Sequence, residues 1–288
     1  MSARNVVCVG GGHGLAITLR AARTYATDLT AIVSVADDGG SSGRIRDATG
    51  LPAMGDIRRC LSALADPAVP LSTVFEYRFA GDVEGHALGN LLIAALADRT
   101  GNFTEAVGSL AEMLGVRAAV LPATDGLVVL CAEAASGTVR GQVAVQQTVG
   151  VEHVWLDPVS PPAPKQALDA LAGARQIVLG PGSLFTSVLA ALAVPDVRDA
   201  VAASAARRVY VCNLRPQRPE TSDYDVAAHV AALRRHGVEP DIVVCHPGTL
   251  PRGHLDVEVL EAPIAASSCL AHDPELLAGV LGALCEAS

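Results

Sequence analysis

The 288-residue sequence is poor in aromatic residues and lacks long apolar runs. Phe, Trp and Tyr make up only 3% of the residues, whereas apolar residues make up 50%. A core of small aliphatic side chains favours alternating strands and helices over an aromatic-rich β fold. No run of about 18 or more uncharged apolar residues occurs, so we expect no membrane insertion. The N-terminus leads directly into a short apolar run, which predicts that the chain has no signal peptide.

Paired cysteines and an excess of positive charge are also missing. The seven cysteines form no C-x-x-C pair, and several lie in apolar, strand-like runs. We therefore expect reduced core residues of a cytoplasmic protein, not disulfides or zinc ligands. The net charge of −9 argues against nonspecific binding of nucleic acid or of an anionic membrane. Nucleotides are not excluded, because a local cluster of glycine amides and arginines can bind phosphate on an acidic protein.

The most informative stretch is residues 36–44, which follows an apolar run that predicts a buried parallel strand. Ligands of open α/β sheets bind beyond the carboxyl ends of the strands, so the stretch has a suitable place for a site. Glycine amides, hydroxyls and an arginine can bind phosphate, while carboxylates can hold a ribose, a base edge or a metal ion. A solvated Asp-Gly turn would not need Ser-Ser-Gly-Arg. The candidate ligand-binding residues are Asp37, Asp38, Gly40, Ser41, Ser42 and Arg44, and the candidate metal ligands are Asp37 and Asp38.

A second glycine-rich turn follows the first predicted strand, residues 5–9. It reads Gly-Gly-Gly-His-Gly-Leu at 10–15, and the apolar positions after it have helical spacing. This order of strand, glycine turn and helix is typical of the first unit of a dinucleotide-binding fold, although the fingerprint is imperfect. The glycines place helix N–H groups where a pyrophosphate can bind. The candidates here are Gly11, Gly12, His13 and Gly14.

Two further segments carry polar residues at predicted helix starts. At 55–61, Asp56 is a candidate helix cap, and Arg58 lies in a first turn, where a bound anion would offset its conflict with the helix dipole. At 85–92, His86 and Asn90 are four residues apart and are expected to share one helix face; His86 is alternatively a helix cap. Asn90 among leucines and alanines is the stronger candidate for ligand contact, because a buried amide needs partners.

The second half of the chain repeats the pattern of a strand that ends in a polar turn. Residues 176–179 predict a strand followed by a glycine turn with a serine at a helix start, a second anion-binding candidate in which Ser183 is alternatively a simple helix cap. A polar, basic loop follows a predicted strand at 208–212. The candidate residues of these two turns are Gly182, Ser183, Asn213 and Arg215.

The order of the elements predicts a Rossmann-like α/β fold with a mostly parallel sheet flanked by helices. We expect one domain over residues 1–288. Residues 66–85 contain prolines and mixed polarity and are expected to leave the α/β core, as a helix or a lid. Residues 117–154 contain short β-rich segments at 118–121, 127–133 and 139–145, separated by turns, which indicate an antiparallel or meander insertion.

Taken together, the motifs resemble the family of the gluconeogenesis factor YvcK and its relative CofD, the 2-phospho-L-lactate transferase. The chain is more similar to the YvcK branch, although His13 and Arg59 stand where the family usually has Thr and Asn. The motifs that carry the resemblance are GGGHGL at 10–15, VADDGGSSGRIR at 35–46, GDIRRCL at 55–61, GHALGNLLIAAL at 85–96, PATD at 122–125, VLGPGSLFTSVL at 178–189, YVCNL at 210–214 and HDP at 272–274.

The resemblance implies a regulatory protein that binds a nucleotide-diphosphate sugar such as UDP-N-acetylglucosamine. It also implies a role in cell-wall and cell-shape control during growth on gluconeogenic carbon. Cell-wall synthesis proteins and a second copy of the chain are the candidate protein partners. The alternative is a CofD-type transferase that moves phospholactate from a guanylyl carrier to a deazaflavin with Mg²⁺. An NAD(P)-dependent oxidoreductase rests only on the first glycine loop and Asp37. No residue is assigned a catalytic role, and no cofactor is assigned beyond the sugar nucleotide and Mg²⁺.

Overall fold

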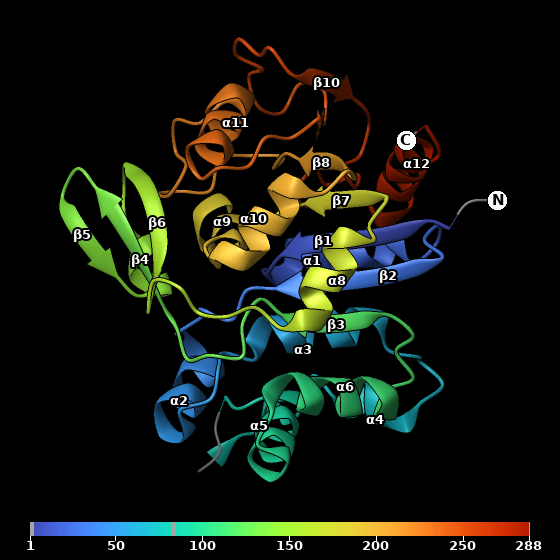
Figure 1. The fold of residues 1–288 in the computed structure, drawn as a ribbon, viewed down its shortest axis with the longest axis vertical. Coiled ribbons are helices and arrows are strands. Elements are labelled where there is room, and N and C mark those ends of the chain that lie inside the picture. The colour runs from blue at the N-terminus through green and yellow to red at the C-terminus, as the bar shows by residue number, and fades with distance from the viewer. Residues whose placement is uncertain (1–2, 82–84, 288) are drawn as a thin grey trace.

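The computed structural model describes residues 3–81 and 85–287. Within these residues, seven parallel strands form the central sheet, in the order β10-β9-β8-β7-β1-β2-β3 (Figure 1). Their inner members are buried along almost their whole length, as expected for strands that helices cover on both faces. The predicted Rossmann-like parallel sheet is therefore confirmed. The strands are β1 (Asn5–Gly10), β2 (Asp28–Val33), β3 (Ala119–Pro122), β7 (Gln176–Leu179), β8 (Arg207–Val211), β9 (Ile242–Cys245) and β10 (Glu258–Glu261).

Helices cover the sheet on both faces, and their apolar sides complete a core of valine, leucine, isoleucine and alanine. In Figure 1, α8 (Lys165–Ala172), α9 (Leu189–Leu192) and α10 (Pro195–Ala203) lie in front of the sheet. Helices α5 (Leu88–Thr100) and α6 (Phe103–Met113) pack together beside the β3 edge. The remaining helices are α1 (Gly12–Ala22), α2 (Gly40–Thr49), α3 (Gly55–Leu64), α4 (Pro70–Val74), α7 (Gln142–Gln146), α11 (Val226–Arg235) and α12 (Pro274–Glu286), and a π-helical turn, Leu184–Val188, leads into α9.

The strand order reverses between β1 and β7. From β1 the chain proceeds to β2 and β3 on one side, and β7 then returns to the other side of β1. Such a switch point leaves a crevice at the carboxyl ends of the two strands, because the connections leave in opposite directions. The crevice is bounded by the glycine-rich turns that follow β1 and β7. Topology therefore brings together two turns that lie about 170 residues apart in the sequence.

A small antiparallel sheet in the order β5-β4-β6 lies beside the main sheet (Figure 1). Its strands are β4 (Val129–Ala134), β5 (Gly137–Arg140) and β6 (Val151–Asp157). The antiparallel character predicted for residues 117–154 is confirmed, but the predicted assignment of its first segment is wrong. Segment 118–121 becomes β3 and pairs in parallel with β2, because its buried side chains complete the main core. The predicted strand 139–145 is also only half correct, since its second half forms α7.

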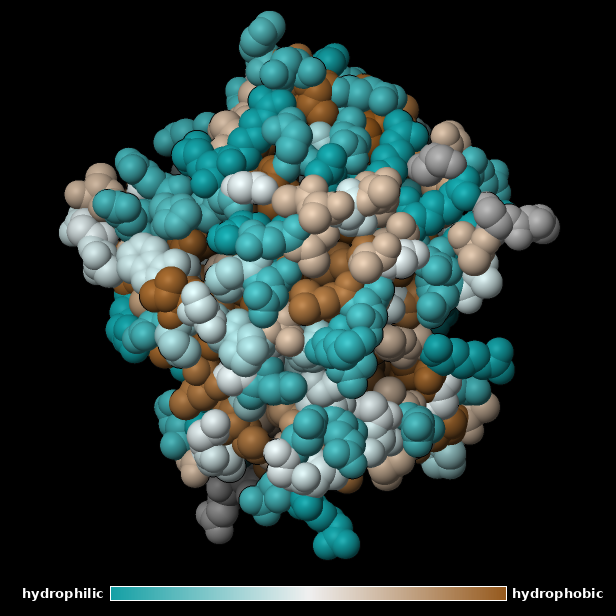
Figure 2. Space-filling view, viewed as in Figure 1, coloured by the Kyte–Doolittle hydropathy of each residue, from teal (hydrophilic) through white to brown (hydrophobic). Residues whose placement is uncertain are grey.

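Other predicted elements need smaller corrections. Six cysteines are buried and free as predicted, but Cys269 is exposed and does not belong to the core. The expected excursion at 66–85 contains α4, and residues 82–84 lie outside the described residues. No helix in the described part of the chain has both the length and the apolar character needed to cross a membrane. Hydrophilic residues dominate the face in Figure 2, where apolar residues form small separate areas.

Candidate functional site

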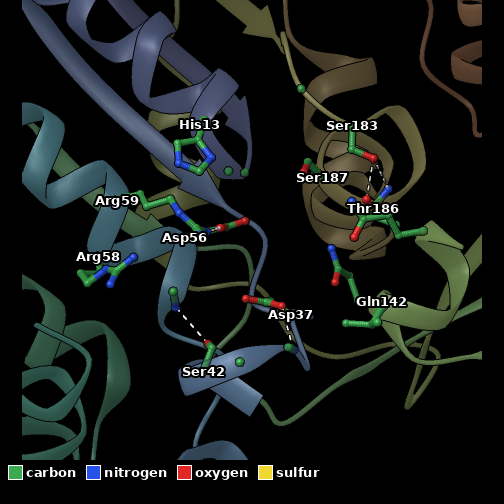
Figure 3. A pocket seen from close by; sticks show the side chains of 18 of the residues that line it. His13, Asp37, Ser42, Asp56, Arg58, Arg59, Gln142, Ser183, Thr186 and Ser187 are labelled. Atoms are coloured by element: carbon green, nitrogen blue, oxygen red, sulfur yellow. Dashed lines mark hydrogen bonds and ion pairs between the residues drawn. The ribbon is translucent and has the colours of Figure 1, made fainter. Parts of the chain in front are cut away.

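A pocket of about 480 Å³ lies at the switch point between β1 and β7. The starts of three helices, α1, α2 and α3, contribute to its wall. Figure 3 shows Arg58 and Arg59 on one side of the pocket, and Ser183, Thr186 and Ser187 on the opposite side. The residues that line the pocket are Gly11, Gly12, His13, Gly14, Asp37, Gly39, Gly40, Ser41, Ser42, Gly55, Asp56, Arg58, Arg59, Arg78, Asn90, Gln142, Val143, Gln146, Gly182, Ser183, Thr186, Ser187 and Gln217.

Convergence of helix N-termini makes this pocket suited to an anion. The first N–H groups of a helix have no partner within the helix, and the helix dipole gives this end a partial positive charge. None of the residues that precede α1, α2 and α3 caps its helix with a side chain. Backbone donors of α1 and α2 therefore face this space. Helix α3 adds the positive end of its dipole, because Ser42 already accepts its first N–H, that of Gly55. This is the arrangement that binds phosphate and diphosphate groups in nucleotide-binding folds.

The first glycine turn owes its shape to close packing against the second. A Cβ atom at Gly14 would collide with the backbone carbonyl oxygen of Pro181. At Gly11, a Cβ atom would collide with the Asp56 carboxylate. Gly12 has a φ of +66°, a conformation that side chains disfavour. Glycines at these positions let α1 begin directly against α3 and the Gly180–Pro181 turn.

Ser42 and Ser41 connect α2 to the helices beside it. Ser42 Oγ accepts hydrogen bonds from the backbone N–H groups of Met54 (3.1 Å) and Gly55 (3.0 Å), which fixes the start of α3. Ser41 Oγ accepts one from Asn90 Nδ2 at 2.9 Å and lies 3.1 Å from His86 Nδ1. His86 and Asn90 do converge, but His86 precedes α5 and does not share a helix face with Asn90. His86 is not the helix cap either, since the capping position is Ala87.

Two carboxylates, Asp37 and Asp56, lie in the pocket in different surroundings. Asp37 follows β2, and its Oδ1 accepts a hydrogen bond from the Gly39 N–H at 2.9 Å. Burial raises the pKa of the Asp37 carboxyl, and that hydrogen bond opposes the rise. Asp56 forms an ion pair with Arg59, one turn later on α3. The prediction that Asp56 caps α3 is wrong, because Met54 is the capping residue and Asp56 lies in the first turn.

Arg58 is a buried cation at the edge of the pocket. Its residue is only 2% exposed, and its Nη1 lies 3.4 Å from Glu76 Oε2. Burial lowers the pKa of the Arg58 guanidinium, and the nearby charge of Glu76 opposes this change. Arg58 was expected in the site, whereas Arg78, which also lines the pocket, was not. No motif marks Arg78, which belongs to a segment of mixed polarity.

Asp38 does not line the pocket, although it follows Asp37 directly. Its carboxylate accepts hydrogen bonds from the N–H groups of Gln142 (3.0 Å) and Val143 (2.9 Å), the first residues of α7. Asp38 therefore ties α7, which follows β5 of the small sheet, to the segment that follows β2 of the main sheet, and this contact positions Gln142 and Gln146 in the pocket. Figure 3 shows Gln142 and Asp37 pointing toward one another. Neither glutamine was predicted, because the segment reads as a strand.

The predicted metal role of Asp37 and Asp38 stays a prediction. Within the part of the chain that the structure describes, no group of three or more His, Cys, Asp or Glu side chains lies close enough to hold a metal ion. Both Asp38 oxygens accept backbone hydrogen bonds, whereas Asp37 has one such bond and faces the pocket. Of the two carboxylates, Asp37 has the geometry that fits an ion bridging protein and phosphate.

The second glycine turn is occupied by a carboxylate of the protein itself. Glu220 is 2% exposed and accepts hydrogen bonds from the N–H groups of Phe185 (2.7 Å) and Thr186 (3.2 Å). The Ser183 hydroxyl donates to the same carboxylate. Burial raises the Glu220 pKa, and these hydrogen bonds oppose the rise. The alternative prediction, that Ser183 caps this helix start, is confirmed, because its side chain accepts the Thr186 N–H. An external anion has no free backbone donor at Phe185 or Thr186, because Glu220 occupies both.

The remaining predicted residues lie beside the pocket. Asn213 exchanges two hydrogen bonds with the backbone of Gly182, at 3.0 and 2.8 Å, and so supports the second turn. Together with Arg215 it lines a neighbouring cavity of about 720 Å³, which shares His13 and other residues with the main pocket. Arg44 lines neither cavity. Four residues that line the pocket lie inside the motifs already quoted but were not candidates: Gly39, Gly55, Arg59 and Ser187.

Comparison with known proteins agrees with this architecture. The family model described as 2-phospho-L-lactate transferase CofD matches residues 6–277, and the chain belongs to this family. A structure described as a member of the UPF0052 family, from Bacillus halodurans, superposes with a TM-score of 0.93 at 34% identity. That match covers 98% of this chain and 99% of the solved one.

Several curated relatives carry the name gluconeogenesis factor. The protein from Halalkalibacterium halodurans is 40% identical over 251 residues, 85% of this chain and 78% of its own length. The Bacillus subtilis protein is 41% identical over 235 residues, 80% of this chain and 74% of its own length. A relative from Nostoc sp. is 46% identical over 232 residues, 79% of this chain. The match spans about half (51%) of that relative's length. The resemblance to the YvcK branch is thus confirmed at the level of family.

Proposed function

We propose that this chain is a gluconeogenesis factor that binds a nucleotide-diphosphate sugar and acts by binding, without turnover. The observation that carries the proposal is the convergence of the starts of α1, α2 and α3 on one pocket. A diphosphate has the charge that these helix ends favour. The pocket volume of about 480 Å³ falls within the range of small-molecule sites, about 300–1,000 Å³.

The polar residues of the pocket have distinct roles in this proposal. The N–H groups of Gly12, His13 and Gly14 at the start of α1 bind the diphosphate. Asp37 accepts hydrogen bonds from a ribose or sugar hydroxyl, since a carboxylate is a strong acceptor. Ser187 and Gln142 contribute neutral polar groups from the opposite wall, where Ser183 is already bonded to Glu220. The name gluconeogenesis factor of the relatives supports a role in gluconeogenic growth. From the resemblance to the YvcK branch we further propose that ligand binding controls cell-wall synthesis and cell shape during such growth, through a cytoplasmic protein partner.

A transferase of the CofD type is the second candidate, and the family match over residues 6–277 favours it. In that reaction the half-buried Asp37 would hold Mg²⁺ against a phosphate or orient the acceptor hydroxyl. The magnesium ion would neutralise charge that develops on the phosphate oxygens. Arg59 would stabilise the same charge from the α3 side, where it already pairs with Asp56.

Isothermal titration calorimetry separates the two candidates. UDP-N-acetylglucosamine, UDP, GDP and NAD are titrated with and without Mg²⁺. We expect saturable binding of the UDP-sugar, which Asp37→Asn weakens about tenfold, the loss of one charge-assisted hydrogen bond. Asp47→Asn is the matched control, because Asp47 is an exposed residue of α2 that does not line the pocket.

Other outcomes contradict the proposal in different ways. Absence of binding for every UDP-sugar rejects it. Preference for GDP with a magnesium requirement, together with product formation from a guanylyl donor and a deazaflavin, establishes the transferase instead. Tight NAD binding with hydride transfer would support an oxidoreductase.

A further inference from the structure

The end of the pocket next to α5 has an excess of positive charge. Of the residues that line the pocket, three are arginines and two are carboxylates, which gives a net +1 (3 − 2) in a chain of net charge −9. Arg59 is already paired with Asp56, beside the first glycine turn. The other two arginines, Arg58 and Arg78, share the α5 end of the pocket with Asn90 and Ser41.

The Arg58 guanidinium lies next to the positive ends of two helices, where a cation is unfavourable unless an anion binds beside it. Arg58 is the fourth residue of α3, and its side chain passes the first turn of α5: a Cβ atom at Gly89 would lie 2.8 Å from Arg58 Cγ. Both helix starts carry partial positive charge. Arg58 Nε and Nη1 are buried and have no hydrogen-bond partner within the described residues. The nearby carboxylate, Glu76, is at 3.4 Å and its side chain is 46% exposed.

Arg78 adds a second guanidinium to the same end. Its Nη1 donates a hydrogen bond to the Gly85 carbonyl oxygen at 2.9 Å, which orients the side chain without neutralising it. Burial is the largest cause of the lowered pKa of the Arg58 guanidinium, and the charges of Arg59 and then Arg78 add to it. Among the described residues, the buried guanidinium of Arg58 and the exposed guanidinium of Arg78 are thus accompanied at this end by one carboxylate, that of the exposed Glu76.

We propose that Arg58 and Arg78 form a subsite for a carboxylate carried by the sugar of the bound nucleotide. The inference rests on the proposed function, in which the diphosphate lies at the start of α1 and the sugar extends along the pocket toward α5. A carboxylate there accepts charge-assisted hydrogen bonds from planar guanidinium groups. It also interacts favourably with the starts of α3 and α5. The ligand class is therefore an acidic nucleotide-diphosphate sugar.

Matched pairs of ligands test this subsite by calorimetry. UDP-glucuronic acid differs from UDP-glucose by a carboxylate in place of a hydroxymethyl group, and UDP-N-acetylmuramic acid differs from UDP-N-acetylglucosamine by an added lactyl carboxylate. In at least one pair we expect the acidic member to bind roughly tenfold more tightly at equal ionic strength, as one charge-assisted hydrogen bond provides. The preference should shrink as salt is added, because screening weakens ion pairs.

Variants assign the preference to the arginines. Arg78→Gln and Arg58→Gln should each bring the acidic-to-neutral affinity ratio close to one. Arg99→Gln is the control, because Arg99 is an exposed residue near the other end of α5 and changes the net charge equally. This control should leave the ratio as in the wild type. Retention of the Arg58→Gln fold is checked by the thermal transition.

Three outcomes overturn the subsite. Equal affinity for both members of both pairs shows that no acidic group is recognised, while the proposed binding of UDP-sugars still stands. An arginine variant that weakens acidic and neutral ligands equally shows that these arginines hold the diphosphate instead. Failure of every UDP-sugar to bind rejects the proposed function together with the subsite.

Discussion

The two glycine-rich turns at the centre of the molecule have similar sequences and different uses. Both follow a buried parallel strand, β1 or β7, and both lead into a helix. The turn at Gly11 has no side-chain cap, and it opens onto the pocket. In the turn at Gly182, the carboxylate of Glu220 takes the helix donors. A strand–glycine–helix pattern thus predicts where helix donors are, but a distant acid decides whether a ligand can reach them.

The largest effect should come from breaking the contact between the two turns. Gly14→Ala places a methyl group against the Pro181 carbonyl, and both groups belong to backbone that cannot rotate away. We expect the free energy of unfolding, measured with urea, to fall by about 3 kcal/mol. Gly108→Ala is the control, because a Cβ atom at this exposed helical position meets nothing within 4 Å. It should stabilise the protein by up to about 1 kcal/mol. Equal stability of the two variants would refute the packing argument.

Removing the Glu220 carboxylate should make the second glycine turn resemble the first, with backbone donors that are free to bind an anion. Glu220→Ala leaves the N–H groups of Phe185 and Thr186 without their acceptor, so we expect a loss of about 2 kcal/mol in unfolding free energy. Inorganic phosphate should then raise the melting temperature of the variant more than that of the wild type, because the helix donors are open to an anion. Glu112→Ala, at an exposed position of α6, serves as control. The same phosphate response in all three proteins would contradict the role given to Glu220.

Asp38 occupies a helix start in the same way as Glu220, but closer to the surface. Asp38→Ala removes the acceptor of the Gln142 and Val143 N–H groups, and we expect a loss of about 1 kcal/mol. Amide hydrogen exchange should accelerate at these two residues and through β5 and α7, because the attachment of the small sheet is weakened. Asp47→Ala, on exposed α2, should change neither quantity. Unchanged exchange at Gln142 would mean that other contacts hold α7 in place.

The smallest expected effect is on the pH dependence of the unfolding free energy. It concerns two carboxyl groups, Asp37 in the pocket and Glu220 in the second glycine turn. Burial raises the pKa of Asp37 and of Glu220 above the ordinary values near about 4. Between the ordinary and the raised pKa the folded protein binds more protons than the unfolded chain, so unfolding free energy falls as pH rises. Asp37→Asn should reduce this fall in a denaturation series from about pH 4 upward. A variant with the same pH dependence as the wild type would show that Asp37 does not contribute.

Local sequence patterns predicted most of the parallel sheet and its glycine turns. Residues 5–9 and 176–179 are continuous apolar runs followed by glycines, and both form the predicted strands. The prediction failed where a segment has apolar residues at spacings that fit both a strand and a helix. The valines at 139, 143 and 145 suggest a strand, yet α7 forms because Asp38, about 100 residues earlier, accepts the donors of its first turn. Segment 118–121 has no local signal that separates the main sheet from the small one.

Candidate site residues were predictable when a motif marked them. Gly12, Asp37 and Ser41 lie in glycine-rich motifs after strands, and all of them line the pocket. Arg78 and Gln142 lie outside every motif. They line the pocket only because the tertiary structure brings their segments there. Asp38 illustrates the opposite error, since it belongs to the same motif as Asp37 but points to α7. Adjacent residues of an extended segment face opposite directions, so one motif can serve a site and a structural contact at once.

The sequence by itself determined the α/β class, the glycine turns and the family, because these depend on hydrophobic runs and on residue types close together in the chain. The tertiary structure decided which donors and charges remain available to a ligand. Glu220 closes one helix start, Asp38 closes another, and Arg58 is left buried beside Arg78. The physical reason is that a hydrogen bond or an ion pair is satisfied in space, often by a partner that lies far away in the sequence.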